Sequence, residues 1–323
     1  MARIIQWIKK NKSSMKFAVE CFDKVKKDCL KFIKSQETKA DKFKNKERMI
    51  KSFLIPLCFW INGKTDKKKP YFVGLAGGQG TGKTTSSSLI KIILSNYFKL
   101  KVFRISIDDF YKTRKERIRL SRRVHPMLLT RGVPGTHDTK MMLDFFKKVK
   151  SKKFKRLKLP KFNKAVDDRS NKKYWYNLKN RPDVIIFEGW CVGAKPEKNN
   201  TLNKTINLME KNKDKKKIWR KYVNQQLKSK YKNLYSQLSC LIYLKAKNFN
   251  LLQKWRLKQE RKLLLNSKKN SKLKIMNKED VLTFMQTYQR ITQNMFKNMP
   301  QYASIIINLN SNHQIKTAVY KRK

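Results

Sequence analysis

Gly77-Gly78-Gln79-Gly80-Thr81-Gly82-Lys83-Thr84 decides the fold, because it has the spacing G-x-x-x-x-G-K-[ST] of a phosphate-binding loop. An apolar run at 71–76 precedes it, and a segment with helical periodicity at 83–96 follows it. Glycines let the backbone turn its N–H groups around phosphate oxygens, and the start of the next helix faces the same oxygens. The stretch predicts a strand, a phosphate-binding loop and a helix. The alternative is a glycine-rich turn without a ligand.

Nucleotide contacts are expected along the whole of this loop. Lys83 has the reach and charge to bridge the β- and γ-phosphates of ATP, and the Thr84 hydroxyl is suited to holding Mg²⁺. The expected ATP-binding residues are Gly77, Gly78, Gln79, Gly80, Thr81, Gly82, Lys83, Thr84 and Thr85. The loop by itself does not indicate which reaction follows nucleotide binding.

Outward from the loop, short apolar runs alternate with helical segments. The strands are expected at 71–76, 102–107, 184–187, 241–244 and 305–309, and the helices at 83–96, 139–149, 217–235, 249–265 and 278–298. This alternation is typical of an α/β fold with a mostly parallel, doubly wound sheet and helices on both faces. Continuously apolar strands fit burial on both faces of such a sheet. Together with the loop, the pattern predicts the P-loop NTPase fold.

Carboxylates follow two of these strands, at the sheet edge where α/β proteins bind their ligands. Asp108 and Asp109 come after the run 102–107, and Glu188 ends the run 184–187. We assign Asp108 as the base for an attacking hydroxyl, Glu188 as a ligand of Mg²⁺, and Asp109 as a metal or substrate ligand. The alternatives are a helix cap for either aspartate, and a buried ion pair with a lysine for Glu188.

Basic residues away from the loop are candidates for the acceptor site. The turn-rich stretch 131–138 begins with Arg131 and contains His137, and Lys164 and Arg169 lie farther along the chain. Arginine and lysine suit a carboxylate or phosphate, and a histidine can donate to a substrate oxygen. The alternative for Lys164 is solvated surface, and the alternative for His137 is a structural role.

A helix expected after the run 241–244 carries Arg256 and Arg261. Either guanidinium can close over the phosphates as a lid and stabilise charge in the transition state. On this basis we assign Arg256 to catalysis. The alternative is an exposed helix on which Glu260 pairs with its neighbours.

The charge of the chain is strongly positive, with 80 Lys and Arg against 22 Asp and Glu, a net charge of +58 in 323 residues. Lysines occur in nearly every segment, which indicates compositional drift over an ordinary fold, and no nucleic-acid-binding module is present. We expect this charge to attract small anionic metabolites. Five cysteines without CxxC spacing indicate a reducing compartment. No apolar stretch approaches the ~20 residues of a membrane span, so a cytoplasmic protein is expected.

Taken in order, the motifs resemble the D-glycerate 3-kinase family of plants, cyanobacteria and fungi, in the phosphoribulokinase and uridine kinase branch of the P-loop kinases. The resemblance runs from about Phe53 to His313 and rests on GGQGTGKTT, SIDDFY, RGVPGTHD, LPKFNKAVDDR, VIIFEGW, WRKYVN, KWRLKQE and FMQTYQRIT. It implies transfer of the γ-phosphoryl group of ATP to a hydroxyl, which in the better-known relatives belongs to D-glycerate. Asn163 departs from the pattern, because an acidic residue is expected there.

By motif, the resemblance places Lys83 and Thr84 on phosphate and Mg²⁺, Asp108 as the base, and Glu188 as the metal-side acid. The resemblance does not cover residues 1–47, where apolar residues at helical spacing in 15–34 predict a charged helical extension. A P-loop kinase domain, 48–323, is expected to follow it. Lys-rich surface insertions are expected at about 150–158 and 195–216.

Three functions follow from the sequence. The first is an ATP-dependent kinase of a small hydroxy acid, with D-glycerate as the foremost acceptor. The second is a kinase of another alcohol, such as a nucleoside or pantothenate. The third is a nucleic-acid-associated ATPase, for which the net charge is the support.

Overall fold

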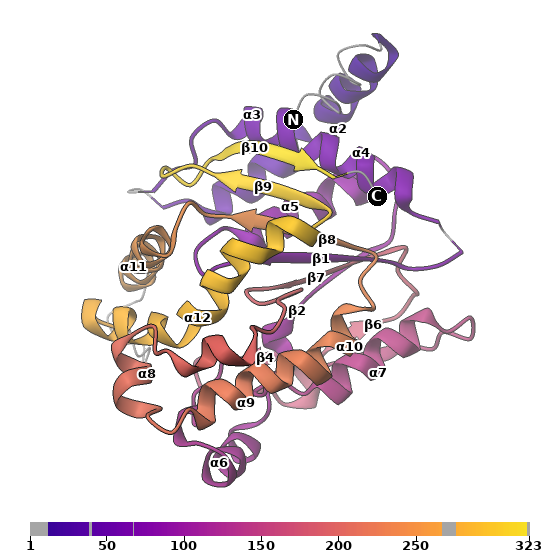
Figure 1. The fold of residues 1–323 in the computed structure, drawn as a ribbon. Helices are drawn as coiled ribbons and strands as arrows, with labels where there is room; N and C mark the ends of the chain where they lie inside the picture. Colours follow the sequence, from indigo (N-terminus) through magenta and orange to yellow (C-terminus); the bar gives the residue numbers. More distant parts are fainter. Residues whose placement is uncertain (1–11, 39–40, 67, 267–275, 322–323) are drawn as a thin grey trace.

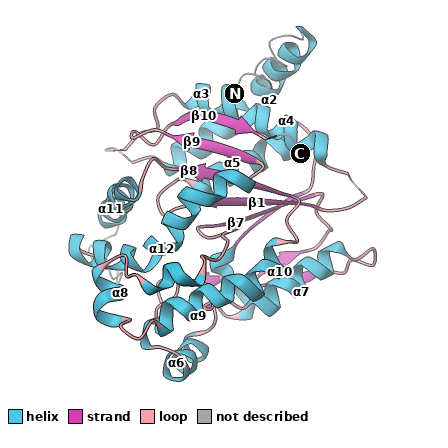
Figure 2. Ribbon diagram, in the orientation of Figure 1, coloured by secondary structure: helices cyan, strands magenta, loops and turns pink. Residues whose placement is uncertain are grey.

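The computed structural model describes residues 12–38, 41–66, 68–266 and 276–321. A six-stranded sheet lies between layers of helices (Figures 1 and 2), with strand order β10-β9-β8-β1-β7-β2. The strands are β1 (Tyr71–Gly77), β2 (Val102–Ser106), β7 (Val184–Gly189), β8 (Cys240–Lys245), β9 (Ile305–Leu309) and β10 (Ile315–Tyr320). Every pairing among the first five is parallel, and β10 pairs antiparallel with β9. The α/β class and the mainly parallel sheet are therefore confirmed.

Two hydrophobic cores lie on the opposite faces of this sheet. In β1, Val73 and Leu75 belong to one core, whereas Phe72 and Ala76 belong to the other. This division follows from the pleat of a strand, which points successive side chains to opposite faces. Because each face is covered by helices, the strand must be apolar throughout, as its sequence is.

Helices of the first core are α2 (Lys12–Gln36), the π-helical turn η1 (Ile50–Leu54), α4 (Ile55–Lys64), α5 (Lys83–Asn96) and α11 (Phe249–Asn266). The short helix α3 (Lys46–Met49) leads into η1. Those of the second core are α6 (Arg114–Arg123), α7 (Thr139–Lys150), α8 (Leu208–Lys213), α9 (Ile218–Gln226), α10 (Lys232–Tyr235) and α12 (Lys278–Tyr302). A π-helical turn, η6 (Leu227–Tyr231), joins α9 to α10, so the helix expected at 217–235 is present with an irregular turn inside it. None of the described helices is both long and apolar enough to cross a membrane.

Helix α2 is part of the first core. Its residues Cys21, Val25, Cys29 and Ile33 have no exposed surface and share a cluster with residues of α4 and α5. The apolar positions repeat at helical spacing, which is why one face of this lysine-rich helix can be buried. The described part of the segment 1–47 therefore packs as one body with the sheet, and residues 1–11 lie outside the described residues.

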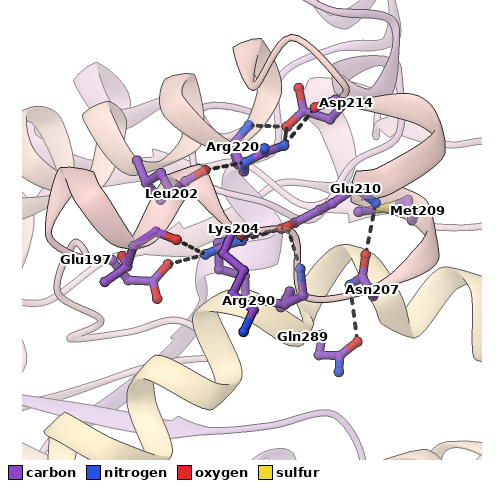
Figure 3. A network of polar contacts seen from close by, with 12 residues as sticks. Glu197, Leu202, Lys204, Asn207, Met209, Glu210, Asp214, Arg220, Gln289 and Arg290 are labelled. Atoms are coloured by element: carbon purple, nitrogen blue, oxygen red, sulfur yellow. Dashed lines mark hydrogen bonds and ion pairs between the residues drawn. The ribbon is translucent and has the colours of Figure 1, made fainter.

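The Lys-rich stretch 195–216 is anchored by its acidic residues (Figure 3). Glu210 accepts two hydrogen bonds from Arg290 of α12, at 2.7 Å from Nε and 2.6 Å from Nη2, and Glu197 lies 3.1 Å from Nη1 of the same arginine. Asp214 pairs with Arg220 at 2.8 Å, and both side chains are buried. The lysines of this stretch are at the surface as expected, whereas its acids form ion pairs in which Glu210 and Asp214 are buried and Glu197 is partly exposed.

Two short ribbons complete the fold beside β2. Strand β3 (Leu157–Leu159) pairs with β6 (Tyr176–Leu178), and β4 (Phe162–Asn163) pairs with β5 (Asp168–Arg169), both antiparallel. These ribbons were not expected from the sequence, because two or three residues are too few to show alternation. They hold the segment 159–169 against the edge of the sheet where the candidate site lies.

Removing the arginine of the buried network should destabilise the protein strongly. In Arg290→Met, two carboxylates lose their cation while the packing of Glu210 keeps it out of water. We expect the free energy of unfolding to fall by about 3–5 kcal/mol in urea titrations. The control Lys297→Met changes an exposed cation of the same helix and should stay within about 0.5 kcal/mol of wild type. Equal effects in the two variants would mean that the network contributes nothing.

Candidate active site

The phosphate-binding loop joins β1 to α5 as predicted. Gly80 and Gly82 have φ of 77° and 80°, in the left-handed region that glycine adopts without a steric penalty. Gly82 is the N-cap of α5, so the first free amides of the helix face the loop. The Thr81 hydroxyl and the Lys83 ammonium both donate to the carbonyl oxygen of Gly78, at 2.8 and 2.9 Å. The loop is thus closed on itself with a half-buried cation beside it.

Helix α11 packs directly on this loop. A Cβ atom on Gly78 would lie 2.3 Å from Cδ1 of Leu252, and one on Gly80 would lie 2.8 Å from Cβ of Trp255. Trp255 in turn stacks on His313, with ring centroids 4.3 Å apart. Only glycine fits at both positions, because any Cβ there would collide with α11. A loop of this shape suits the phosphates of a nucleotide.

The predicted metal-side residues, Thr84 and Glu188, are in contact. The Thr84 hydroxyl donates to Oε1 of Glu188 at 3.1 Å, across the gap between α5 and the end of β7. Burial raises the pKa of Glu188, and the Lys83 ammonium opposes this rise. A hydroxyl and a carboxylate beside the loop are oxygen donors of the kind that Mg²⁺ takes, so the donor set fits the metal.

Arg104 is a site residue that the sequence analysis missed. Its Nη1 donates to the carbonyl of Thr84 at 2.8 Å and to the hydroxyl of Ser88 at 2.6 Å. It also contributes to the electrostatic environment of Glu188. An arginine inside the apolar run 102–107 is the sequence signal that would have revealed it.

Asp108 lies at the end of β2 with two polar partners. Its Oδ2 accepts from the Lys164 ammonium at 2.8 Å, and its Oδ1 accepts from the Tyr111 hydroxyl at 3.1 Å. Burial acts to raise the pKa of this carboxyl, but its surroundings, with the Lys164 cation first and the Lys83 cation also contributing, more than offset burial and hold the pKa below its usual value. Asp108 is therefore an ionised carboxylate at neutral pH.

Asp109 points away from the metal-side pair. Its carboxylate accepts from the backbone N–H of Ser106 at 3.3 Å, from that of Phe162 at 3.4 Å, and from the Tyr176 hydroxyl at 3.4 Å. Together with the Ser106 hydroxyl it forms a capping box on the turn at 107–110. Burial raises its pKa to about 6. The arrangement is that of the helix cap named as the alternative, and it argues against the metal assignment.

The acceptor-side cations differ in what they are bound to. Arg169 donates to Asp138 at 3.0 Å and to the carbonyl of Tyr111 at 2.9 Å, so it ties two chain segments together. Lys164 has an exposed side chain and, through Asp108, a place at the reaction centre. Arg131 pairs with Asp167 and lies over the ring of Phe162, at 5.4 Å from its centroid. Lys164 is thus the most exposed of the three cations, and Arg131 and Arg169 are each paired with an aspartate.

Asp167 binds three arginines at once, which sequence reasoning did not foresee. Besides Arg131, it pairs with Arg114 at 3.2 Å and with the fully buried Arg117 at 3.0 Å. Its φ of 54° turns the chain sharply between β4 and β5. The ribbon that carries Lys164 is therefore fastened to α6 and to the stretch 131–138.

Arg256 belongs to α11, and its side chain reaches toward α12. It pairs with Glu260, donates to Gln259 at 3.1 Å, and its guanidinium carbon is 5.9 Å from the ring centroid of Phe284. The pairing with Glu260 is the helix-surface alternative named above. Its backbone N–H nevertheless lies beside Gly80, so the residue adjoins the phosphate-binding loop.

His137 is buried, with 1% of its surface exposed. It stacks on the ring of Tyr111, at 4.4 Å between centroids, and its Nδ1 lies 2.6 Å from the hydroxyl oxygen of Tyr231. Asp138 caps α7 by accepting from the N–H of Met141, as expected. The site thus brings together the loop, Glu188, Asp108, Lys164 and His137, and leaves Asp109 and Arg169 in structural contacts.

Comparison with known proteins agrees with this arrangement. No family model matches the sequence. The uncharacterized kinase mug58 of Schizosaccharomyces pombe is 27% identical over 242 residues, which cover 72% of this chain and 80% of that protein. The chloroplastic D-glycerate 3-kinase of Arabidopsis thaliana is 26% identical over 227 residues, covering 64% of this chain but 47% of that protein. The structure of a D-glycerate 3-kinase from Cryptococcus neoformans has a TM-score of 0.67 at 23% identity, covering 84% of this chain and 97% of the other.

Pantothenate kinases of bacteria match a shorter region. That of Lacticaseibacillus casei is 31% identical over 130 residues, 40% of each chain. The relatives confirm the resemblance that the motifs indicated, and the solved structure confirms the P-loop kinase fold. The chain is accordingly an ATP-dependent phosphotransferase that acts on an alcohol group, a P-loop kinase related to D-glycerate 3-kinases.

Proposed function

We propose that the protein transfers the γ-phosphoryl group of ATP to a hydroxyl of D-glycerate, with Mg²⁺, to form 3-phosphoglycerate. The observation that carries this proposal is the pair formed by Asp108 and Lys164 at the end of β2. A carboxylate there can take the proton of an attacking hydroxyl, and cations beside it can take the carboxylate of a hydroxy acid. The similarity to a D-glycerate 3-kinase supports the same acceptor.

In this proposal each residue has a role that its contacts allow. Asp108 orients the acceptor hydroxyl and receives its proton, while Lys83 neutralises charge on the phosphates. Thr84 and Glu188 are the residues that would hold Mg²⁺, which supplies electrostatic stabilisation of the phosphoryl group when bound. Arg131 and Lys164 position the acceptor through its carboxylate. Because phosphoryl transfer needs little covalent chemistry from the protein, positioning and charge account for catalysis.

A nucleoside acceptor is less well supported, because it would require a free aromatic surface for stacking. Both tryptophans that might serve are tied into the structure. Trp190 is buried and donates to the carbonyl of Gly132 at 2.9 Å, and Trp175 donates to that of Ser170 at 2.9 Å. Pantothenate, which also carries a carboxylate, is the alternative acceptor that the same cations would accommodate, and a pantothenate kinase is among the relatives.

A phosphoryl-transfer assay with ATP, Mg²⁺ and a panel of alcohols tests this function. We expect D-glycerate to give a higher kcat/KM than pantothenate, uridine or glycerol. The control Asp108→Asn should lose roughly 10²–10⁴-fold in kcat while binding ATP as wild type does, because it keeps the shape but not the base. A higher kcat/KM for another alcohol would contradict the assignment of D-glycerate as the acceptor. Full activity of Asp108→Asn would contradict the assignment of Asp108 as the base.

Glu188 and Asp109 should respond differently to loss of charge. Glu188→Gln removes an anionic oxygen beside Thr84, and we expect it to raise the Mg²⁺ concentration for half-maximal activity roughly 10–100-fold. Asp109→Asn should leave that concentration unchanged and lower the free energy of unfolding by about 1 kcal/mol, because it weakens a cap. Magnesium titrations of both variants check this. The reverse pattern would support Asp109, and not Glu188, as the Mg²⁺ ligand.

The pH dependence of kcat/KM should depend on Lys164, the cation beside the proposed base. The base must be ionised to accept a proton, and Lys164 holds the pKa of Asp108 below its usual value. In Lys164→Met burial acts unopposed by that cation, so the pKa rises and the acid limb of kcat/KM moves to higher pH. Lys161→Met, an exposed lysine of the same segment, should not move the limb. An unchanged acid limb in Lys164→Met would show that another group sets it.

A further inference from the structure

The side chain of Tyr231, at the end of the turn η6, is held by two polar groups of the stretch 131–138. It is fully buried, and its hydroxyl oxygen accepts from the backbone N–H of Gly135 at 3.0 Å. The Nδ1 atom of the His137 ring lies 2.6 Å from the same oxygen. One phenol therefore contacts one backbone N–H donor and one ring nitrogen.

Counting protons at this hydroxyl settles the state of the imidazole. A phenol oxygen has two positions at which it accepts and one proton that it donates. The backbone N–H of Gly135 fills one accepting position. Among the described residues, Nδ1 is the only acceptor at hydrogen-bond distance from this hydroxyl, so the buried phenol proton is paired only when it is directed to Nδ1. Nδ1 must then be the unprotonated nitrogen of His137, and in a neutral ring the proton sits on Nε2.

The opposite nitrogen, Nε2, has no hydrogen-bond partner among the described residues, although it is buried. An unmatched buried N–H costs free energy that a purely structural histidine would not carry. The ring lies at the reaction centre, because it stacks on Tyr111, whose hydroxyl donates to Asp108. Asp108 and His137 are also close enough to interact electrostatically.

The ring stays neutral over the range in which the enzyme works. Burial lowers the pKa of His137 to about 3, and Lys112 lowers it further, while Asp108 opposes both. Burial likewise holds the pKa of Tyr231 well above its usual value, so the phenol keeps its proton. The imidazole is thus a fixed donor and not a group that exchanges protons during turnover.

We propose that Tyr231 is a positioning residue, whose hydroxyl locks His137 in the tautomer protonated at Nε2 and so keeps a buried N–H ready for an oxygen of the acceptor. This inference rests on the proposed function, since it concerns the same acceptor site. It assigns His137 a neutral hydrogen bond to the acceptor, whereas Lys164 and Arg131 provide the charge that a carboxylate needs. A hydroxyl or carboxylate oxygen of a small hydroxy acid has the required accepting lone pair.

The tautomer can be read directly by NMR of the full chain made with isotope-labelled histidine. The sequence has three histidines, His125, His137 and His313, so single substitutions are enough to assign each ring's NMR signals. At neutral pH the His137 ring should be protonated at Nε2 and bare at Nδ1. Tyr231→Phe should convert this to a mixture of the two tautomers. A wild-type ring protonated at Nδ1, or at both nitrogens, would overturn the proposal whatever the acceptor is.

Kinetics supply the second readout. Tyr231→Phe should raise KM for the acceptor roughly 3–10-fold, the worth of one neutral hydrogen bond, with KM for ATP unchanged. Tyr235→Phe is the matched control, because Tyr235 is one turn farther along and donates only weakly, to Sγ of Cys191 at 3.6 Å. Equal KM values for the acceptor in Tyr231→Phe and wild type would contradict the positioning role.

A pair of substitutions at His137 guards against a variant that merely fails to fold. Glutamine places its amide nitrogen about where Nε2 lies, whereas asparagine places it near Nδ1. His137→Gln should therefore keep an acceptor KM close to wild type, and His137→Asn should raise it. The reverse order would overturn the role of the Nε2 proton. If glycerate is not phosphorylated at all, the proposed function fails, while the NMR result still decides the tautomer.

Discussion

The carbonyl oxygen of Gly78 is the point on which the active site depends. It receives hydrogen bonds from the Thr81 hydroxyl and the Lys83 ammonium, and thereby reverses the chain between β1 and α5. The reversal sets where α5 begins, and the second residue of that helix, Thr84, then meets Glu188 at the end of β7. Without this turn the strand-end carboxylates would face no phosphate-binding loop. The other contacts of the site therefore depend on the path of the chain through this turn.

Much of this was predictable because it is encoded locally. The strand, loop and helix around residues 77–84 follow from glycine spacing and apolar periodicity, and all five expected strands are present. The location of Asp108 and Glu188 at the carboxyl edge of the sheet was predictable because both follow strands of a parallel sheet. In each case the deciding information lies within about ten residues of the position concerned.

What could not be predicted depends on partners distant in the sequence. Asp109 was assigned to the metal side, but its carboxylate accepts hydrogen bonds from the N–H of Phe162 and the hydroxyl of Tyr176. Arg169 was expected to bind the acceptor, yet Asp138 and the Tyr111 carbonyl occupy it. For the same reason the buried acids of the stretch 195–216 were not predicted, because the sequence around Glu210 gives no indication that Arg290 is its partner. The strongly basic composition adds to the difficulty, because the sequence does not distinguish a lysine or arginine with a function from the many at the surface.

The fit of α11 against the loop has a mechanical consequence. Leu252 and Trp255 sit where side chains of Gly78 and Gly80 would be, so the loop has no slack on that side. Any displacement of these glycines by an incoming nucleotide has to be shared by the start of the helix, and with it by the stacked ring of His313. The loop, α11 and the turn after β9 therefore form one continuous series of contacts that reaches the edge of the sheet.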